Sequence, residues 1–228
     1  MLLNLDEVIP WGRCLDEYIG MFSLEESDPG LKILDCAGGT ANFNAEMTRQ
    51  GQKVISCDPV YQLTAEQIRA HLPEYHDFIN GFEASRPNYL WNIFESPEHL
   101  AEERWEATEE FLEDFPLGLQ QDRYVTAELP DLPFYDDQFD LALCSHFLFP
   151  DTHLSENFPL AAITEMCRVA REVRVFPLLD WNGERFEHLE PIVTELRNRS
   201  FHVEREKVDY EFQPGGNEML RVSKESSA

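Results

Sequence analysis

The sequence has few basic residues. It contains 18 lysines and arginines against 44 aspartates and glutamates, so its formal net charge is −26 over 228 residues. No run of basic residues interrupts this acidic excess. Nucleic acids and anionic lipid surfaces are bound through basic faces, so we expect neither nucleic acid nor a membrane as a partner. The simplest account of the charge is a strongly solvated acidic surface.

Cysteine is also scarce. The five cysteines are isolated, and none belongs to a Cys-x-x-Cys pair or to a cysteine–histidine spacing typical of a metal site, so we expect no metal. Cys36, Cys57 and Cys144 fall in predicted strands, where a thiol is usually a small buried apolar group. Neither a signal peptide nor an apolar stretch of membrane-spanning length is evident. Together these features favour a reducing, cytoplasmic location.

A predicted strand and glycine turn at residues 31–43 organise the chain. The strand ends in Asp35, which places a carboxylate at its tip. Gly38 and Gly39 allow bare backbone to approach a ligand, and the helix expected from Thr40 onward directs free N–H groups to the same point. This combination can bind a nucleotide-like molecule that carries an amine and a carboxylate. It is equally compatible with an ordinary β–α turn that needs glycine only for its geometry.

A second acidic strand tip follows at Asp58. It lies 23 residues after Asp35, about where a β-α-β unit places the acid that binds ribose hydroxyls. A dinucleotide site needs Gly-x-Gly-x-x-Gly, and residues 37–42, Ala-Gly-Gly-Thr-Ala-Asn, lack that spacing. The stretch instead resembles motif I of class I S-adenosylmethionine-dependent methyltransferases. Asp35 and Gly39 match that motif, while Ala37 and Ala41 replace its outer glycines.

Later motifs extend the resemblance over roughly residues 11–222. Residues 124–134 and 137–146 resemble the third and fourth strands of those enzymes, including Leu-Pro-Phe and Phe-Asp-Leu. Within that superfamily, the sequence is most similar to a poorly characterised bacterial group. The similar segments are residues 11–13, 58–61, 145–149, 173–178 and 215–217. The resemblance implies S-adenosyl-L-methionine as the cofactor and a methyl transfer. The resemblance does not identify the methyl acceptor, which we expect to be a small molecule.

The resemblance also implies a single α/β domain over residues 1–228. Its Rossmann-like sheet would have the order 3-2-1-4-5-7-6, with an antiparallel last strand. Strands are predicted at 31–36, 53–58, 139–145, 173–178, 201–212 and 218–223, and residues 213–217 are typical of a hairpin turn.

Residues 73–122 are too long for the usual link between the second and third strands. The segment is rich in aromatic residues and helical in composition, so we expect a helical cap insertion. It would leave from the edge of the sheet that binds ligands. A substrate lid and an oligomer interface, including that of a homodimer, both remain open.

The resemblance assigns most cofactor contacts to the strand tips. Asp35 would hold the cofactor amine, and Asp58 both ribose hydroxyls. The turn of Ala37, Gly38 and Gly39 would leave room for the methionine portion. The remaining candidates are Arg13 and Tyr18 for the cofactor carboxylate, Pro59 and Val60 for the adenine face, and Glu128 and Leu129 for the adenine amine. Ser145, at the end of the fourth strand, would point into the crevice beside the cofactor. A capping role for Asp35 and a solvated acid at Glu128 are the ordinary alternatives.

His146 is the candidate catalytic residue. An imidazole titrates near neutrality and can deprotonate an acceptor hydroxyl or amine. A hydrogen-bonded histidine without a catalytic role is an equal alternative, because methyl transfer needs mainly in-line positioning. The expected acceptor-binding residues are His146, Tyr61, Tyr89, Trp91, Phe94 and Asn217.

Two other functions remain open on the sequence. One is a Rossmann oxidoreductase that uses an NAD-type cofactor. The other is a non-catalytic domain that binds an adenosyl ligand and recruits a partner through the acidic, aromatic insertion. The replacement of glycines by Ala37 and Ala41 keeps this second alternative open.

Overall fold

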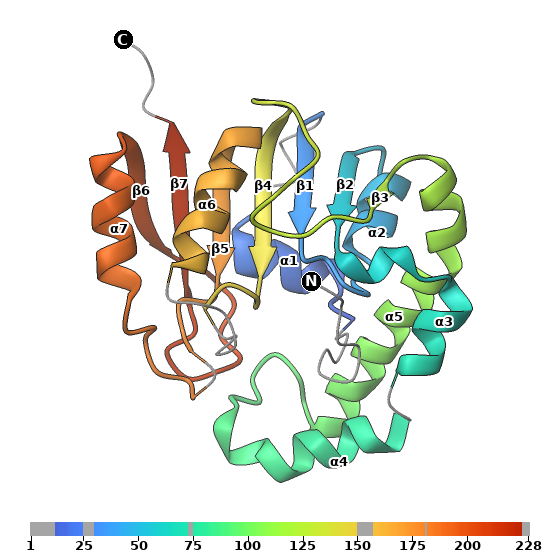
Figure 1. Cartoon of the computed structure of the whole chain (residues 1–228). Coiled ribbons are helices and arrows are strands. Elements are labelled where there is room, and N and C mark those ends of the chain that lie inside the picture. The colour runs from blue at the N-terminus through green and yellow to red at the C-terminus, as the bar shows by residue number, and fades with distance from the viewer. Residues whose placement is uncertain (1–11, 25–29, 73–74, 150–156, 181, 225–228) are drawn as a thin grey trace.

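A single twisted sheet forms the centre of the molecule. The computed structural model describes residues 12–24, 30–72, 75–149, 157–180 and 182–224. In this part of the chain, seven strands pair in the order β3-β2-β1-β4-β5-β7-β6 (Figure 1). Their bounds are β1 Lys32–Cys36, β2 Lys53–Cys57, β3 Tyr124–Val125, β4 Phe139–Ser145, β5 Ala170–Phe176, β6 Phe201–Lys207 and β7 Glu218–Lys224.

Strand direction confirms the predicted fold. The pairs β3–β2, β2–β1, β1–β4 and β4–β5 are parallel. β7 lies antiparallel between β5 and β6. The carboxyl ends of β1, β2 and β4 therefore meet at one edge of the sheet, where an open α/β sheet binds its ligands. This is the strand order of the class I methyltransferase fold.

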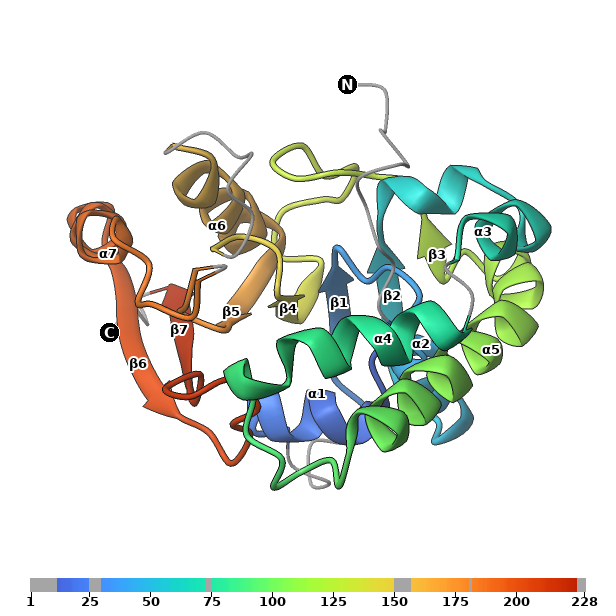
Figure 2. The same cartoon turned by 90° about the horizontal axis from the view of Figure 1, so that it is seen from below.

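Helices cover both faces of the sheet. Their bounds are α1 Leu15–Phe22, α2 Phe43–Arg49, α3 Ala65–His71, α4 Tyr75–Ser85, α5 Pro97–Gln120, α6 Phe158–Val169 and α7 Leu189–Asn198, with short 3₁₀ turns η1 Pro59–Gln62 and η2 Arg86–Asn88. α6 and α7 lie on one face, whereas α1 and α2 lie on the other (Figure 1 and Figure 2). α4 lies beyond the carboxyl ends of the parallel strands (Figure 1).

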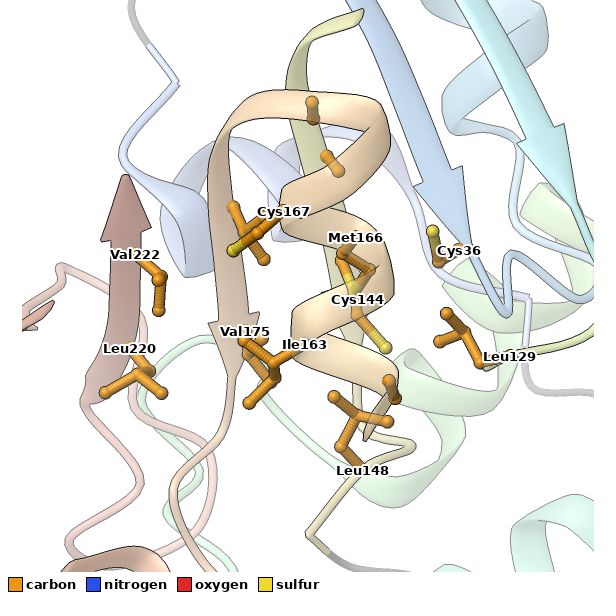
Figure 3. Packing of buried hydrophobic residues seen from close by; sticks show 14 of the residues in the cluster. Cys36, Leu129, Cys144, Leu148, Ile163, Met166, Cys167, Val175, Leu220 and Val222 are labelled. Atoms are coloured by element: carbon orange, nitrogen blue, oxygen red, sulfur yellow. The ribbon is translucent and has the colours of Figure 1, made fainter. Parts of the chain in front are cut away.

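The larger core lies between the sheet and α6. Figure 3 shows Ile163, Met166 and Cys167 of α6 beside Val175 of β5 and Leu220 of β7. Dense packing of such side chains holds the helix on the sheet. The predicted burial of the cysteines in strands is confirmed, since Cys36, Cys57 and Cys144 are all buried.

A second core lies between α1 and the opposite face. The ring of Tyr18 stacks on Phe43 of α2, with centroids 4.3 Å apart. The helical spacing of apolar residues predicts Ile19 on the buried stripe of α1, but its side chain is 39% exposed. Met21 and Glu17 are buried instead. The apolar pattern does not predict Glu17 there, and its burial is explained by the ion pairs described below.

The last hairpin departs from the prediction. β6 ends at Lys207, not at residue 212, although β7 begins at Glu218 as expected. Tyr210 and Phe212 leave the strand and are buried in the second core, which removes residues 208–212 from the sheet. Burial of two aromatic rings outweighs the continued strand pairing.

The insertion is helical, as predicted, and its long helix is part of the domain core. Phe111 and Phe115 of α5 pack with Tyr61 of η1 and Tyr124 of β3. Gly118 permits this packing, because a Cβ there would lie 2.3 Å from the Tyr124 ring. α5 therefore belongs to the insertion and also supports the β2–β3 side of the sheet.

Candidate functional site

The first acidic strand tip is a buried carboxylate. Asp35, at the carboxyl end of β1, is 1% exposed. Its Oδ1 accepts a hydrogen bond from the Tyr18 hydroxyl at 3.1 Å, and its Oδ2 accepts one from Ser56 Oγ at 2.9 Å. Burial raises the pKa of Asp35 to about 7, and the two hydrogen bonds offset only part of this rise. A carboxylate in this state gains from a neighbouring cation.

The glycine turn combines one crowded and one open position. A Cβ on Gly38 would lie 2.4 Å from Asp35 Oδ2 and 2.8 Å from the Tyr61 hydroxyl, so only glycine fits without movement. Gly39 has φ +53°, and no atom of the described chain would lie within 4 Å of a Cβ there. Ala37 also has a positive φ, of 54°, a conformation that favours glycine. The space over Gly39 allows a ligand to approach the backbone.

The second acidic tip holds the turn in place. Asp58 Oδ2 accepts a hydrogen bond from the Gly39 N–H at 3.0 Å, and Oδ1 accepts one from the Val60 N–H at 2.8 Å. Burial raises the pKa of Asp58 to about 6. A carboxylate offers about four acceptor positions, so these two bonds leave capacity for ribose hydroxyls.

The residues after Asp58 turn partly away from the strand edge. Val60 is buried in the cluster formed with α5. The ring of Tyr61 lies in the same cluster, with its centroid 5.9 Å from that of Phe111. Its hydroxyl oxygen lies close to Gly38, 2.8 Å from where a Cβ would be. An adenine face at Pro59 and Val60, and an acceptor contact at Tyr61, stay predictions.

The segment after β3 places its two candidates differently. Glu128 is exposed and pairs through its backbone with Asp131. Leu129 is buried in the large core, and Figure 3 shows it beside Cys36 at the end of β1. The adenine role of both residues stays a prediction.

His146 follows β4 and has the positive φ of 53°. Its backbone N–H donates to the Phe176 carbonyl at 2.6 Å, and its Nδ1 lies 2.8 Å from Ser145 Oγ. Burial, followed by the positive charges of Arg13 and Arg104, holds the pKa of His146 well below its usual value. The imidazole is therefore neutral at physiological pH, which is the form that can accept a proton.

Three residues that the sequence reasoning missed surround Arg13. Glu17 Oε1 accepts hydrogen bonds from Arg13 Nη1 at 3.3 Å, Arg104 Nη2 at 2.7 Å and the Tyr210 hydroxyl at 2.7 Å. Arg13 and Glu17 stand four apart in sequence, which is a helical pairing distance. Arg104 shares the buried face of α5 with Leu100 and Phe111. The sequence signal for this cluster was Arg104 itself, a charged residue at the helical spacing of the buried apolar residues.

The three candidate aromatic residues of the insertion gather around Phe212. Tyr89 stacks on Phe212 at 4.4 Å between centroids, while Trp91 and Phe94 approach it edge-on at 5.6 and 5.4 Å. These contacts join the insertion to the segment between β6 and β7. Whether the rings also line an acceptor pocket stays a prediction.

Asn217 lies in the same segment between β6 and β7. Its side-chain amide donates to Glu211 Oε2 at 3.2 Å, and its backbone carbonyl accepts from the Val208 N–H at 3.0 Å. These bonds give Asn217 a role in shaping the loop. Its contact with an acceptor stays a prediction.

Other features of the described residues lie outside this edge. An open depression of about 510 Å³ is lined by Thr126, Ala127, Asp131, Leu132, Pro133, Glu165 and Arg168. In the described ranges, no group of three or more histidines, cysteines, aspartates or glutamates is placed to hold a metal ion. No helix in those ranges is long and apolar enough to cross a membrane.

Comparison with solved structures finds distant likenesses. The magnesium protoporphyrin IX methyltransferase ChlM of Synechocystis PCC 6803, with bound SAH, is 14% identical at a TM-score of 0.49. The match covers 92% of this chain and 81% of that one. A TehB-like SAM-dependent methyltransferase of Corynebacterium glutamicum is 15% identical at a TM-score of 0.47, over 88% and 83% of the two chains. At this distance they carry no argument about activity.

A full-length relative defines the family. No known protein-family profile matches the chain. The uncharacterized protein MJ0045 of Methanocaldococcus jannaschii is 34% identical over 223 residues, which cover 96% of this chain and 98% of the relative. The chain therefore belongs to the same family as MJ0045 of Methanocaldococcus jannaschii.

Proposed function

We propose that the protein is an S-adenosylmethionine-dependent methyltransferase with a small-molecule acceptor. The observation that carries this proposal is the carboxyl edge of β1 and β2. There Asp35 and Asp58 flank a glycine turn with open space over Gly39. The antiparallel β7 between β5 and β6 supports a methyltransferase sheet over an NAD-binding one.

The residues at this edge fit the parts of the cofactor. Asp35 is a buried carboxylate whose pKa of about 7 would fall beside an ammonium group, so it suits the cofactor amine. Asp58 has remaining acceptor capacity for the ribose hydroxyls. Gly39 leaves the backbone bare where the chain linking these groups would pass. When bound, S-adenosylmethionine supplies a methyl group on a sulfonium sulfur that keeps the C–S electron pair on transfer.

The protein would contribute positioning and one proton acceptor. Burial keeps the pKa of His146 low and its imidazole neutral, so it can take a proton from an acceptor hydroxyl or amine. Ser145 Oγ holds the ring by its contact with Nδ1, so the proton would be taken by Nε2. The buried surroundings of the strand tips exclude water from the reacting groups.

Isothermal calorimetry with S-adenosylhomocysteine and with NADH tests the cofactor. We expect S-adenosylhomocysteine to bind and NADH not to bind. Asp58→Ala should weaken the adenosyl ligand by about 1.5–3 kcal/mol, roughly ten- to a hundredfold, because hydrogen bonds to a charged acceptor are lost. Asp136→Ala is the matched control, since that carboxylate is 76% exposed and precedes β4 at the opposite edge.

The outcomes separate the competing functions. Binding of NADH without S-adenosylhomocysteine would overturn the proposal. An unchanged affinity in Asp58→Ala would remove that residue from the site. If the adenosyl ligand binds but no methyl group passes from labelled S-adenosylmethionine to any member of a broad metabolite panel, the protein is a non-catalytic adenosyl-ligand-binding domain.

A further inference from the structure

Among the described residues, the cluster of Arg13, Arg104 and Glu17 at the carboxyl edge contains more positive than negative charge. Arg104 is 2% exposed and Arg13 15% exposed by side-chain area, and both bond to the single carboxylate of Glu17. Glu17 Oε1 also accepts from Tyr210, and Oε2 accepts from the Cys14 N–H at 3.3 Å. The single negative charge of Glu17 therefore pairs with two positive charges. A buried unbalanced charge is costly unless a ligand pairs with it.

Arg104 has unused hydrogen-bond donors. Its Nη2 bonds to Glu17, but its Nε and Nη1 are buried without a partner in the described chain. Buried polar groups in native proteins are nearly always bonded, so two unpaired guanidinium nitrogens on one side chain need an explanation. Guanidinium N–H groups form short, strong bonds with carboxylates. The missing partner is thus expected to be an anion with oxygen acceptors.

The position of Arg104 connects it to the reacting end of the site. One turn further along α5, Thr108 Oγ1 lies 3.4 Å from Thr40 Oγ1 in the glycine turn. On the other side, Tyr210 packs on Phe176 at 5.7 Å, and Phe176 packs on His146 at 5.4 Å. The arginine cluster therefore lies between the turn after β1 and the histidine after β4.

We propose that Arg104 binds a carboxylate of the methyl acceptor, so that the substrates are small organic acids. The inference rests on the proposed methyltransferase function and names its substrate class. Arg104 belongs to the helical insertion, which makes α5 the element that selects the acceptor. The overall charge of −26 repels an acidic substrate, and a local positive site offsets that repulsion.

The cofactor is the other possible source of a carboxylate, and Arg13 is better placed for it. The cofactor carries its carboxylate and its ammonium on one carbon, so an ammonium at Asp35 brings the carboxylate close to Tyr18. Tyr18 bonds to Asp35 and stands near Arg13, whose charge acts on the Tyr18 hydroxyl. No hydrogen bond among the described residues joins Arg104 to Asp35 or Tyr18. Arg104 is thus left for a second anion.

Binding measurements on the protein saturated with S-adenosylhomocysteine test the proposal. The probes are benzoate, phenylacetate and succinate, each beside its uncharged amide, with the melting temperature as the readout. We expect at least one carboxylate to stabilise the wild type while its amide does not. Arg104→Gln should lower the affinity for that carboxylate at least about tenfold, because the charged donor is lost. Arg171→Gln, which changes an arginine 72% exposed at the opposite edge, should leave it unchanged.

Calorimetry with S-adenosylhomocysteine separates the two sources of the carboxylate. Its affinity for Arg104→Gln should stay within about threefold of the wild type. A larger loss, with 5′-methylthioadenosine binding unchanged, would assign Arg104 to the cofactor and overturn the proposal. If S-adenosylhomocysteine binds but no carboxylate stabilises the wild type, the substrate class is wrong while the methyltransferase proposal stands. Arg104→Lys, which keeps the charge, should restore part of the carboxylate effect and replaces Arg104→Gln if that variant does not fold.

Discussion

Two arginines at opposite edges of the sheet have opposite surroundings. Arg168, on α6 near the amino ends of the strands, is 35% exposed, yet every one of its nitrogens is bonded. Its partners are the Glu165 carboxylate, Asp136 and the carbonyls of Leu132 and Phe134. Arg104, near the carboxyl ends, is 2% exposed, and only one of its nitrogens is bonded to a described residue.

This contrast reverses the usual relation between burial and hydrogen bonding. Arg168, which is partly buried, bonds the loop before β4 to α6, so its role is structural. The buried arginine is left incomplete, which is expected at a functional site where local rules are broken for a ligand. On the proposed function, the amino edge of the sheet supplies stability, whereas the carboxyl edge supplies binding groups.

The largest effect should follow from adding a side chain at the close contact between Gly12 and α5. A Cβ on Gly12 would lie 2.6 Å from the Arg104 carbonyl oxygen, 2.8 Å from the Thr108 nitrogen and 2.1 Å from Thr108 Oγ1. Backbone atoms of α5 cannot yield easily, so we expect Gly12→Ala to lower the free energy of unfolding by about 3 kcal/mol. Urea denaturation measures the change.

Gly81→Ala is the control for that substitution. Gly81 lies inside α4, where a Cβ meets no described atom within 4 Å, and alanine should stabilise the helix by up to about 1 kcal/mol. An unchanged stability in Gly12→Ala would show that α5 is loosely held at the carboxyl edge.

The carboxylates at the two edges should respond to pH with opposite signs. Burial raises the pKa of Asp35 from 3.8 to about 7, so the folded state holds this proton more tightly than the unfolded state. The stability that Asp35 contributes is therefore full below pH 3.8 and is lost as the pH rises towards 7, at up to about 1.4 kcal/mol per pH unit. We expect Asp35→Asn to remove about 2 kcal/mol of this dependence between pH 5 and pH 7.

Glu165 gives the opposite case. Its hydrogen bonds to Arg168 lower its pKa below 4.5, so its contribution is present above pH 4.5 and is lost as the pH falls through the lowered value. Glu165→Gln should therefore change the pH dependence only on the acid side. Urea denaturation between pH 3.5 and pH 8 measures both variants. Parallel curves for the wild type and Asp35→Asn would show that Asp35 is ionised throughout.

At the amino edge, Arg168→Met should lower the free energy of unfolding by about 1 kcal/mol. Several bonds are lost together, but a side chain that is about one-third exposed is screened by solvent. Affinity for S-adenosylhomocysteine should not change, because Arg168 lies far from the strand tips that hold the glycine turn. Arg171→Met, at a residue 72% exposed, should cost less than about 0.5 kcal/mol. A loss of ligand affinity in Arg168→Met would contradict the assignment of a structural role to the amino edge and a binding role to the carboxyl edge.

The sequence predicted those parts of the molecule that depend on local patterns. β4 occupies its predicted residues, Phe139–Ser145. Apolar runs fix strands, and glycine with acidic residues fixes the turns between them. For the same reason, local patterns alone are enough to place Asp35 and Asp58 at one edge of the sheet.

The remainder depends on partners that are distant in sequence. Glu17 meets Arg104 across 87 positions and Tyr210 across 193, so no spacing rule could reveal the cluster. Likewise, the aromatic residues of the insertion are visible as a group in the sequence, but their packing around Phe212 is not. A pattern identifies a side chain that is to be buried, but it does not identify its neighbours.

Replacing Arg104, although it is almost fully buried, should change the stability only slightly. Removing one partner of a buried ion pair usually costs about 3–5 kcal/mol, because the other charge is left alone. Glu17, however, keeps Arg13, Tyr210 and the Cys14 N–H when Arg104 is replaced. The substitution also removes two buried nitrogens that lack partners among the described residues. We therefore expect Arg104→Met to change the free energy of unfolding by less than about 1 kcal/mol, while the response to carboxylates is lost. Urea denaturation without ligand measures the first quantity, and a loss near about 4 kcal/mol would mean that Arg104 is, like Arg168, a structural residue.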